Sequence, residues 1–302
     1  MRQQRGAALL VAMLVVTLVA TLAAGLQWRQ WRLLQAEAAA RAQSQAGWVL
    51  VGALDWARLI LREDARSAGN NGLMDHLGEP WALPLQEVKL ASFLTAESLR
   101  DASQETAYLS GSITDAQSKI NLSNLTVSET GQPAPLSQTY ASLMRLYQQL
   151  NLPPEELKQW TERWQAKSDG ALRPMRIEQL TWLGVPPDNV ELLKNYLTIL
   201  PSRTPVNLNT ASAAVIFASV PSMDMATAQK LVTARAQSPM KSLSDASRLM
   251  GLGVNLPESD FNVYSQYFEV RGRLRLDDWV IAEESLVRRE GLSVTTVWRR
   301  RR

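Results

Sequence analysis

The sequence of 302 residues contains no cysteine and a single histidine, His76. The absence of cysteine excludes disulfide frameworks, thiolate zinc sites and thiol nucleophiles, but it does not identify the compartment. One histidine leaves little room for a serine–histidine–aspartate triad or a histidine-based metal cluster. His76 lies in the turn-rich segment 75–81, and we interpret it as a structural loop residue. We therefore expect the protein not to be an enzyme.

The sequence also lacks a large excess of charge of either sign. Its 32 basic and 29 acidic residues give a formal net charge of +3, which is not a polyanion-binding composition. Charge therefore implies no nucleic-acid partner. The chain is longer than a usual single domain, so we expect two folded regions in addition to its N-terminal segment.

A long uncharged segment lies near the N-terminus. No charged residue occurs from Gly6 to Trp28, and residues 7–26 read AALLVAMLVVTLVATLAAGL. A helix of this length, at about 1.5 Å per residue, crosses a bilayer core of about 30 Å. Arg2 and Arg5 lie just before the segment, so the positive-inside rule places the N-terminus in the cytoplasm and the following chain outside.

An ordinary cleaved signal peptide is the alternative to a retained anchor, because the small residues Ala23-Ala24-Gly25 also fit that pattern. Two features favour the anchor. The apolar run is longer than a typical signal core, and helical character continues without proline from Gln27 to Arg66. From Leu34 onward the pattern is amphipathic, and its apolar face strengthens toward the C-terminal end, as expected for a helical spine under a folded head.

The middle of the chain changes from strand signals to helix signals. Residues 108–114 predict a strand, and the turn-forming residues Asp115, Asn121 and Asn124 follow it. From Leu136 to about Gly253 strand signals nearly vanish, and helices are predicted over 136–150, 155–167, 177–183 and 188–200. The helical region lies between two strand-forming regions, which indicates an inserted helical domain.

The segment Val206–Ala211 and the helices on either side of Pro221-Ser222-Met223-Asp224 resemble a helix-hairpin-helix motif. Such motifs often bind DNA, with glycine amides of the hairpin close to the phosphates. This hairpin contains no glycine, and Asp224 would repel a phosphate. We therefore interpret the motif as a packing element.

The C-terminal residues predict an antiparallel meander. Alternating apolar residues over 267–276 and 279–289 predict a hairpin, and a turn at Glu290-Gly291 leads to a third strand over 292–298. We expect this sheet to pack on the upper part of the spine helix. We interpret the final residues, Arg299–Arg302, as a frayed and solvated tail, with lipid headgroups as the alternative contact.

The order of these features resembles the K-type minor pseudopilins of bacterial type II secretion. The dipeptide Arg5-Gly6 before the apolar run resembles the leader of type IV pilins and pseudopilins, which is cleaved after the glycine. The resemblance implies that Ala7 is the mature, methylated N-terminus. Most members carry a glutamate at the fifth mature position, whereas K-type members characteristically lack it, and Val11 stands there. The segment Asp115–Leu125 resembles a further family element, with Ser118 where glycine is usual.

The resemblance implies an α+β fold. A long, pilin-like N-terminal helix would lie against an antiparallel sheet, interrupted by a large all-helical inserted domain of the helix-hairpin-helix or SAM-like type. The implied parts are a prepilin leader at residues 1–6, a transmembrane segment at 7–28, the spine helix with the first part of the head at 29–125, the helical insertion at 126–262 and the closing strands at 263–302.

The resemblance further implies a non-enzymatic subunit at the tip of a periplasmic pseudopilus, which starts or caps its assembly for export of folded proteins across the outer membrane. The implied partners are minor pseudopilins I and J, other pseudopilins, and prepilin peptidase as the processing enzyme. The protein would be a single-pass protein of the bacterial inner membrane with its C-terminal domain in the periplasm. The alternative is a membrane-tethered helix-hairpin-helix DNA-binding protein of a competence-type system.

Pseudopilin heads of this kind often bind calcium through an acidic loop in the insertion. The matching segment Trp164–Arg173 has a single carboxylate, Asp169. Calcium usually takes about six to eight oxygen ligands, so the loop does not supply a site. No metal or cofactor is expected, unless distant carboxylates such as Asp64 or Glu79 converge.

Overall fold

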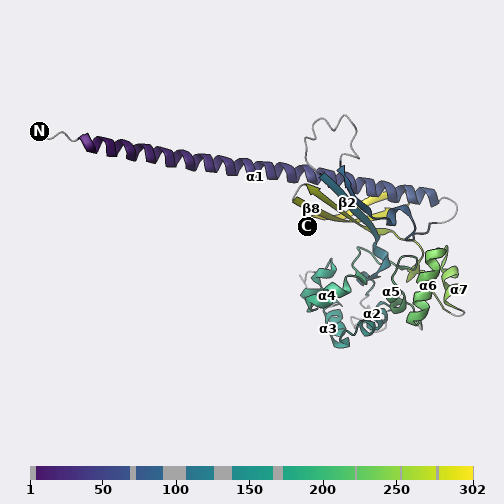
Figure 1. The fold of residues 1–302 in the computed structure, drawn as a ribbon. Coiled ribbons are helices and arrows are strands. Elements are labelled where there is room, and N and C mark those ends of the chain that lie inside the picture. The colour runs from purple at the N-terminus through teal and green to yellow at the C-terminus, as the bar shows by residue number, and fades with distance from the viewer. Residues whose placement is uncertain are drawn as a thin grey trace. The chain divides into compact units, whose positions relative to one another are not determined.

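The structure is a computed structural model that describes residues 5–68, 73–90, 107–125, 138–165, 173–221, 223–251, 254–276 and 279–301. The chain divides into two compact units, Met1–Gly52 and Ala53–Arg302. Helix α1 (Arg5–Ala68) runs through the boundary between them (Figure 1).

The first unit consists of the N-terminal part of α1. Alanine and leucine, which have high helix propensity, are frequent in its sequence, and up to Trp28 the helix is apolar on all sides. Over residues 9–34 its large apolar side chains are exposed, with Leu9 at 66% and Leu34 at 64%. Helix α1 is therefore long and apolar enough to cross a membrane, as the sequence predicts.

The second unit contains one antiparallel sheet with the strand order β1-β2-β7-β8-β9. The strands are β1 (Leu85–Lys89), β2 (Ala107–Asp115), β7 (Tyr267–Leu276), β8 (Trp279–Glu290) and β9 (Ser293–Arg301). The predicted meander is confirmed, although the expected turn at 277–278 lies outside the described residues. Strands β1 and β9 form the two edges of the sheet.

The two faces of the sheet pack against different partners. On one face, Leu54, Ala57 and Leu61 of α1 pack with Phe268 and Val287 of the sheet. The expected packing of the meander on the upper spine helix is thus present. On the other face, a smaller apolar cluster joins the sheet to the helical region through Tyr267 and Leu286 of the sheet and Leu200 of the helical region.

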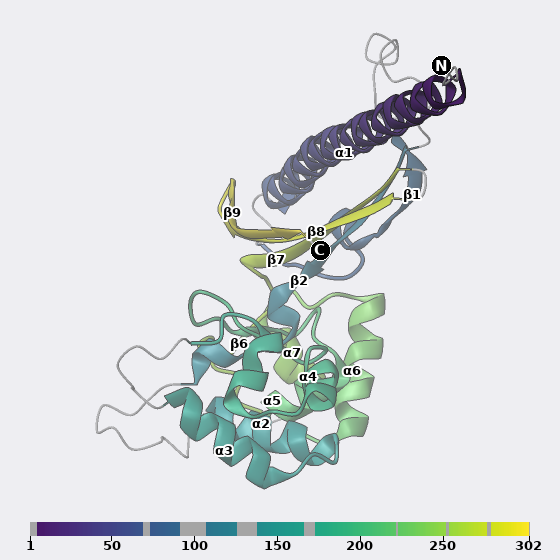
Figure 2. The ribbon, with the colours of Figure 1, turned by 90° about the vertical axis from the view of Figure 1, so that its left-hand side faces the viewer.

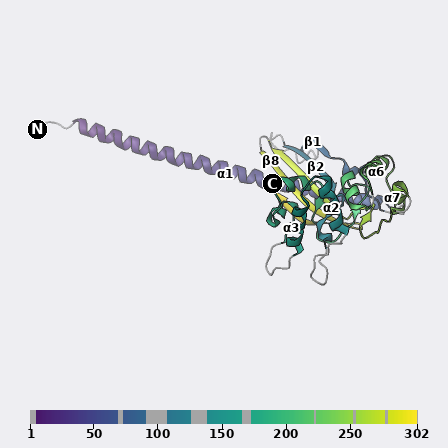
Figure 3. The ribbon, with the colours of Figure 1, turned by 90° about the horizontal axis from the view of Figure 1, so that it is seen from below.

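The helical region lies between β2 and β7 in the sequence and forms its own core. Figure 2 shows the sheet between the end of α1 and this region, and Figure 3 shows α2, α3, α6 and α7 gathered in it. Its α-helices are α2 (Gln138–Gln149), α3 (Pro154–Gln165), α4 (Pro187–Leu193), α5 (Ala213–Ser219), α6 (Met225–Gln237) and α7 (Leu243–Met250), with a 3₁₀ helix, η7, at Ile177–Leu183. The α+β fold with an inserted helical domain is confirmed.

The prediction that strands are nearly absent from Leu136 to about Gly253 is confirmed for the described residues, apart from two strands of two residues each. Short parallel pairs join β3 (Ile120–Asn121) to β4 (Leu197–Thr198) and β5 (Val206–Asn207) to β6 (Phe261–Asn262). The helix expected over 188–200 ends at Leu193, because the following residues extend to pair with β3. Two-residue strands have no periodicity of their own, so the sequence pattern cannot reveal them.

The interpretation of the terminal arginines as a frayed tail was wrong for the residues described. Arg299, Arg300 and Arg301 belong to β9 and pair with Glu283 and Glu284 of β8. Both glutamates are buried, with 4% and 7% of their surface exposed. Burial of a carboxylate is unfavourable unless a cation compensates it. The ion pairs with these two glutamates therefore hold the end of β9 on β8.

Ending the chain at Trp298 is expected to destabilise the head, because Glu283 loses both of its arginine partners. Loss of one partner from a fully buried ion pair costs about 3–5 kcal/mol, and the part-exposed arginines reduce this to about 1–3 kcal/mol. The measurement is chemical denaturation of the truncated and full-length chains. Arg248→Ala, which breaks the exposed pair with Asp245, is the control and should change stability little. Equal stability of the truncated and full-length chains would contradict the assignment.

Candidate functional site

The sequence-predicted processing and assembly residues lie at the start of α1. Gly6 and Ala7 are both helical, and Val11 is 62% exposed on the apolar surface of the helix. An exposed valine places no charge in this surface. The cleavage after Gly6 and the assembly role of position 11 stay predictions.

A buried polar network joins the sheet to the inserted domain. Its centre is Asp115, at the end of β2, whose carboxylate accepts hydrogen bonds from Thr210, Asn207 and Ser265 at 2.5–3.0 Å. Asp115 also accepts from the backbone N–H of Gln117 at 2.7 Å, which is the local turn expected from the sequence. The joint between the two parts of the head is therefore polar and specifically bonded.

Arg289 of β8 extends this network to the end of α1. Its guanidinium donates to Asp64 of α1 at 2.7 Å, to both carboxylate oxygens of Asp75 at 2.5–2.6 Å, and to the carbonyl of Ser265 at 2.9 Å. Only 1% of the Arg289 side chain is exposed, and the Asp75 side chain is fully buried. The contacts link the end of α1 and the segment at Asp75 to Ser265 and β8, about two hundred positions later in the sequence.

Three carboxylates converge at this point, among them Asp64 and Glu79, whose convergence the sequence left open. One oxygen from each of Asp64, Asp75 and Glu79 lies within 4.8 Å of the others, a spacing that a divalent cation would fit. The guanidinium of Arg289, however, already donates to Asp64 and Asp75 and neutralises part of their charge. This donor set therefore does not fit calcium, which would compete with a buried guanidinium. Asp169 of the insertion loop lies outside the described residues.

Glu79 is the third member of the cluster and lies beside His76. Its carboxylate accepts from the indole N–H of Trp81 at 2.6 Å and from the backbone N–H of His76 at 3.0 Å. The imidazole of His76 accepts from the backbone N–H of Gly78, consistent with a structural loop histidine. Burial raises the pKa of Glu79 to about 7 and that of Asp115 to about 6.

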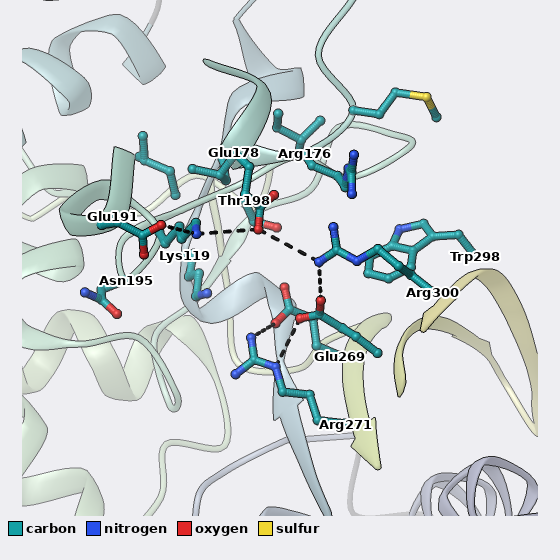
Figure 4. Close-up of a pocket in the computed structure, with 16 residues that line it drawn as sticks. Lys119, Arg176, Glu178, Glu191, Asn195, Thr198, Glu269, Arg271, Trp298 and Arg300 are labelled. Carbon is teal, nitrogen blue, oxygen red and sulfur yellow. Dashed lines mark hydrogen bonds and ion pairs between the residues drawn. The ribbon is translucent and has the colours of Figure 1, made fainter. Parts of the chain in front are cut away.

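A charged cleft of about 440 Å³ separates the inserted domain from the sheet (Figure 4). Glu178, Glu191 and Lys194 line it from the inserted domain, while Arg271, Glu284 and Arg300 line it from the sheet. The charges alternate in sign: Lys194 pairs with Glu178 and Glu191 on one side, Arg271 and Arg300 pair with Glu284 on the other, and Arg300 also reaches Glu178. Neither this cleft nor its pairing was predicted from the sequence.

In the helix-hairpin-helix segment Arg235 is placed for packing, whereas Lys230 is exposed. Arg235 is buried and donates to the backbone carbonyl of Leu208, and burial lowers its pKa to about 10. Asp224 caps the N-terminus of α6 by accepting from the backbone N–H of Thr227 at 2.7 Å. Ser222 of the hairpin lies outside the described residues. Arg235 is thus not available for a phosphate.

The fold defines a class of protein: a pilin-like head, with the C-terminal turns of a long helix on an antiparallel sheet, that carries an inserted helical domain. The family model of type II secretion system (T2SS) protein K matches residues 206–262, which span β5 to β6. Type II secretion system protein K of Pseudomonas aeruginosa is 27% identical, with 92% of this chain and 86% of that protein covered.

A solved structure has the same fold at lower sequence identity. It is a chain of the GspK–GspI–GspJ complex from the enterotoxigenic Escherichia coli type 2 secretion system, with a TM-score of 0.64 and 17% identity. The match covers 86% of this chain and 97% of that one. The chain is thus a homologue of type II secretion system protein K, and the family resemblance seen in the sequence is confirmed.

The raised pKa values predict a head that is more stable in mild acid than at alkaline pH. The folded state holds the Glu79 proton more tightly than the unfolded chain does. This contribution is therefore full below the unfolded pKa of 4.5 and is lost as the pH rises through about 7. We expect the free energy of unfolding to fall by about 1–3 kcal/mol between pH 5 and pH 8.

Glu79→Gln tests this assignment, because glutamine cannot titrate. The change should flatten the pH dependence, measured by denaturant unfolding at several pH values, while Asp115 preserves part of it. Glu63→Gln is the matched control, because Glu63 is an exposed glutamate that pairs with Arg66. A pH profile of Glu79→Gln that matches the wild type would exclude Glu79 as the titrating group.

Proposed function

We propose that the protein is a minor pseudopilin of type II secretion that sits at the tip of the periplasmic pseudopilus and starts or caps its assembly. The observation that carries the proposal is the large helical domain inserted between β2 and β7 of a pilin-like head, together with the match to protein K along most of the chain. On this proposal the protein is a structural subunit and not an enzyme.

The partners proposed for the chain are minor pseudopilins I and J and the other pseudopilins. The solved structure that shares the fold is a complex of GspK with GspI and GspJ, which supports this assignment. On this proposal α1 anchors the protein in the inner membrane, and the sheet and inserted domain lie in the periplasm.

A cap needs to accept a neighbour on one side only. The inserted domain adds bulk to the head, which would block a further subunit from stacking above it. Val11 lacks the carboxylate with which a pseudopilin would pair a neighbour's N-terminal amine, and an unpaired charge in this apolar environment would be costly. Both features favour an end position.

The DNA-binding alternative gains no support from the fold. Its motif belongs to the part of the chain that the protein K model matches, and Arg235 is buried against a backbone carbonyl. We therefore propose no nucleic-acid partner. We also propose that the head needs no bound metal at its carboxylate cluster, because Arg289 supplies the compensating positive charge.

Cleavage by prepilin peptidase is expected between Gly6 and Ala7. The peptidase acts at the cytoplasmic face, where the short charged leader meets the apolar helix. N-terminal sequencing of the membrane-bound protein should give Ala7 as the first residue. Gly6→Leu should leave the leader attached, whereas Gly25→Leu, inside the apolar segment, should not. A mature start near Leu26 would indicate an ordinary signal peptide instead.

Complex formation tests the proposed function directly. The tagged full-length protein, extracted in detergent from cells that also express the I and J pseudopilins of the same system, is expected to co-purify with both. An unrelated single-pass membrane protein with the same tag is the control for detergent-mediated association. Failure to retain either pseudopilin would contradict the proposal.

A further inference from the structure

Strand β9 changes face along its length. Val294, near its start, packs in the apolar cluster on the α1 face of the sheet. Trp298, four residues later, packs against the cluster on the opposite face, toward the inserted domain. Residues an even number apart share one face of a regular strand, so β9 is irregular between these two positions.

A β-bulge at Val297 causes this change. Val287 of β8 pairs with Thr296, while the adjacent Leu286 pairs with Trp298, so Val297 is an extra residue in β9. A shift of one residue transfers all the following side chains to the other face of the sheet. Without the bulge, Arg300 would point toward α1.

With the bulge, Arg300 points into the charged cleft, where Figure 4 shows it between the two sides. Its Nη2 atom lies 2.5 Å from Glu284 of β8 and 3.9 Å from Glu178 of the inserted domain. Glu178 in turn lies 3.7 Å from Lys194, and Glu284 lies 3.1 Å from Arg271. Arg300 therefore connects a row of ion pairs on the sheet with another on the inserted domain.

Among these ion pairs of the described residues, the Arg300–Glu178 pair, which crosses the cleft, has the longest distance. The side chains of Arg300 and Glu178 are 25% and 37% exposed, and their distance is at the outer limit of an ion pair. Exposed pairs contribute little energy each and are screened by salt. Such a contact holds a preferred arrangement while allowing it to be released.

We infer that the bulge in β9 turns the C-terminal end of the chain into an electrostatic latch, in which Arg300 holds the inserted domain in one orientation against the sheet. The buried network around Asp115 is the pivot, and the Arg300–Glu178 contact is the releasable arm on the cleft side. Opening the latch widens the cleft and leaves the pivot intact.

Electron–electron distance measurements on spin labels can test the latch. The natural chain has no cysteine, so cysteines introduced at the exposed positions Lys158 of α3 and Gln86 of β1 would be the sole labelling sites. In the full-length protein in detergent micelles, Glu178→Arg places a like charge opposite Arg300. We expect the population of open arrangements to rise about two- to fivefold, the range typical of one exposed pair.

Salt provides a second, mutation-free measurement. Raising NaCl to about 1 M shortens the Debye length to about 3 Å, and it should shift the wild-type distances in the same direction as Glu178→Arg. Adding Arg300→Gln to Glu178→Arg removes the repelling charge and should reduce the effect. These three results together would support the latch.

The matched control is Asp245→Arg, which reverses a carboxylate beside Arg248 in α7, away from the cleft. It should leave the distance distribution unchanged. Wild-type distances in Glu178→Arg, or wild-type distances that do not respond to salt, would overturn the inference. The salt titration decides the question even if a variant folds poorly.

Discussion

The buried guanidinium of Arg289 is the constraint on which the head depends. It binds Asp64 at the end of the spine helix and Asp75 in the loop that follows, and it also donates to the backbone of Ser265. Each of these groups would be costly to bury alone, because apolar surroundings offer no hydrogen bonds in place of those lost to water. Removing Arg289 would therefore leave two carboxylates uncompensated at once, and the end of α1, the loop and β8 would lose their common contact.

The joint between the sheet and the inserted domain combines the apolar cluster around Leu200, Tyr267 and Leu286 with a set of buried hydrogen bonds. Asn121 donates to the carbonyl of Ser202, and Asn124 donates to that of Thr204, each across about eighty positions in the sequence. Fully bonded buried networks specify one arrangement, because any alternative leaves polar groups unpaired. An apolar joint of the same size would tolerate sliding. The polar joint thus fixes the pivot of the inserted domain.

The sequence predicted the local turns at this joint but not the hydrogen bonds that connect the sheet to the inserted domain. Local turn chemistry predicted that Asp115, Asn121 and Asn124 bond their own backbone. Asp115 and Asn121 do so, whereas Asn124 bonds the backbone of Thr204. Their bonds to Asn207, Ser202 and Thr210 depend on a tertiary arrangement that no local pattern encodes. The buried role of Arg289 could not be predicted from the sequence either. A charged residue in a strand of alternating polarity is normally assigned to the solvent-facing side, and the sequence does not show that α1 covers that side.

The last strand illustrates a similar limit and its physical reason. From sequence, four arginines at a chain end indicate solvent, because like charges repel and chain ends fray. Here Glu283 and Glu284 of the neighbouring strand reverse that expectation, and both lie directly opposite arginines in the register. Alternation along β9 divides the arginines between the two faces of the sheet, and the bulge at Val297 decides which face Arg300 takes.

An edge strand exposes unpaired backbone groups, and charged side chains on such a strand oppose pairing with other chains. The arginines of β9 therefore protect the sheet edge while they neutralise β8, and Arg300 in addition reaches the inserted domain. A hydrophobic strand at this edge would bind β8 equally well through its backbone. It would, however, leave Glu283 and Glu284 without compensating charge, and it would remove the charge that connects the two sides of the cleft. The arginines of β9 therefore satisfy three constraints at once: protection of the sheet edge, neutralisation of β8 and contact with the inserted domain.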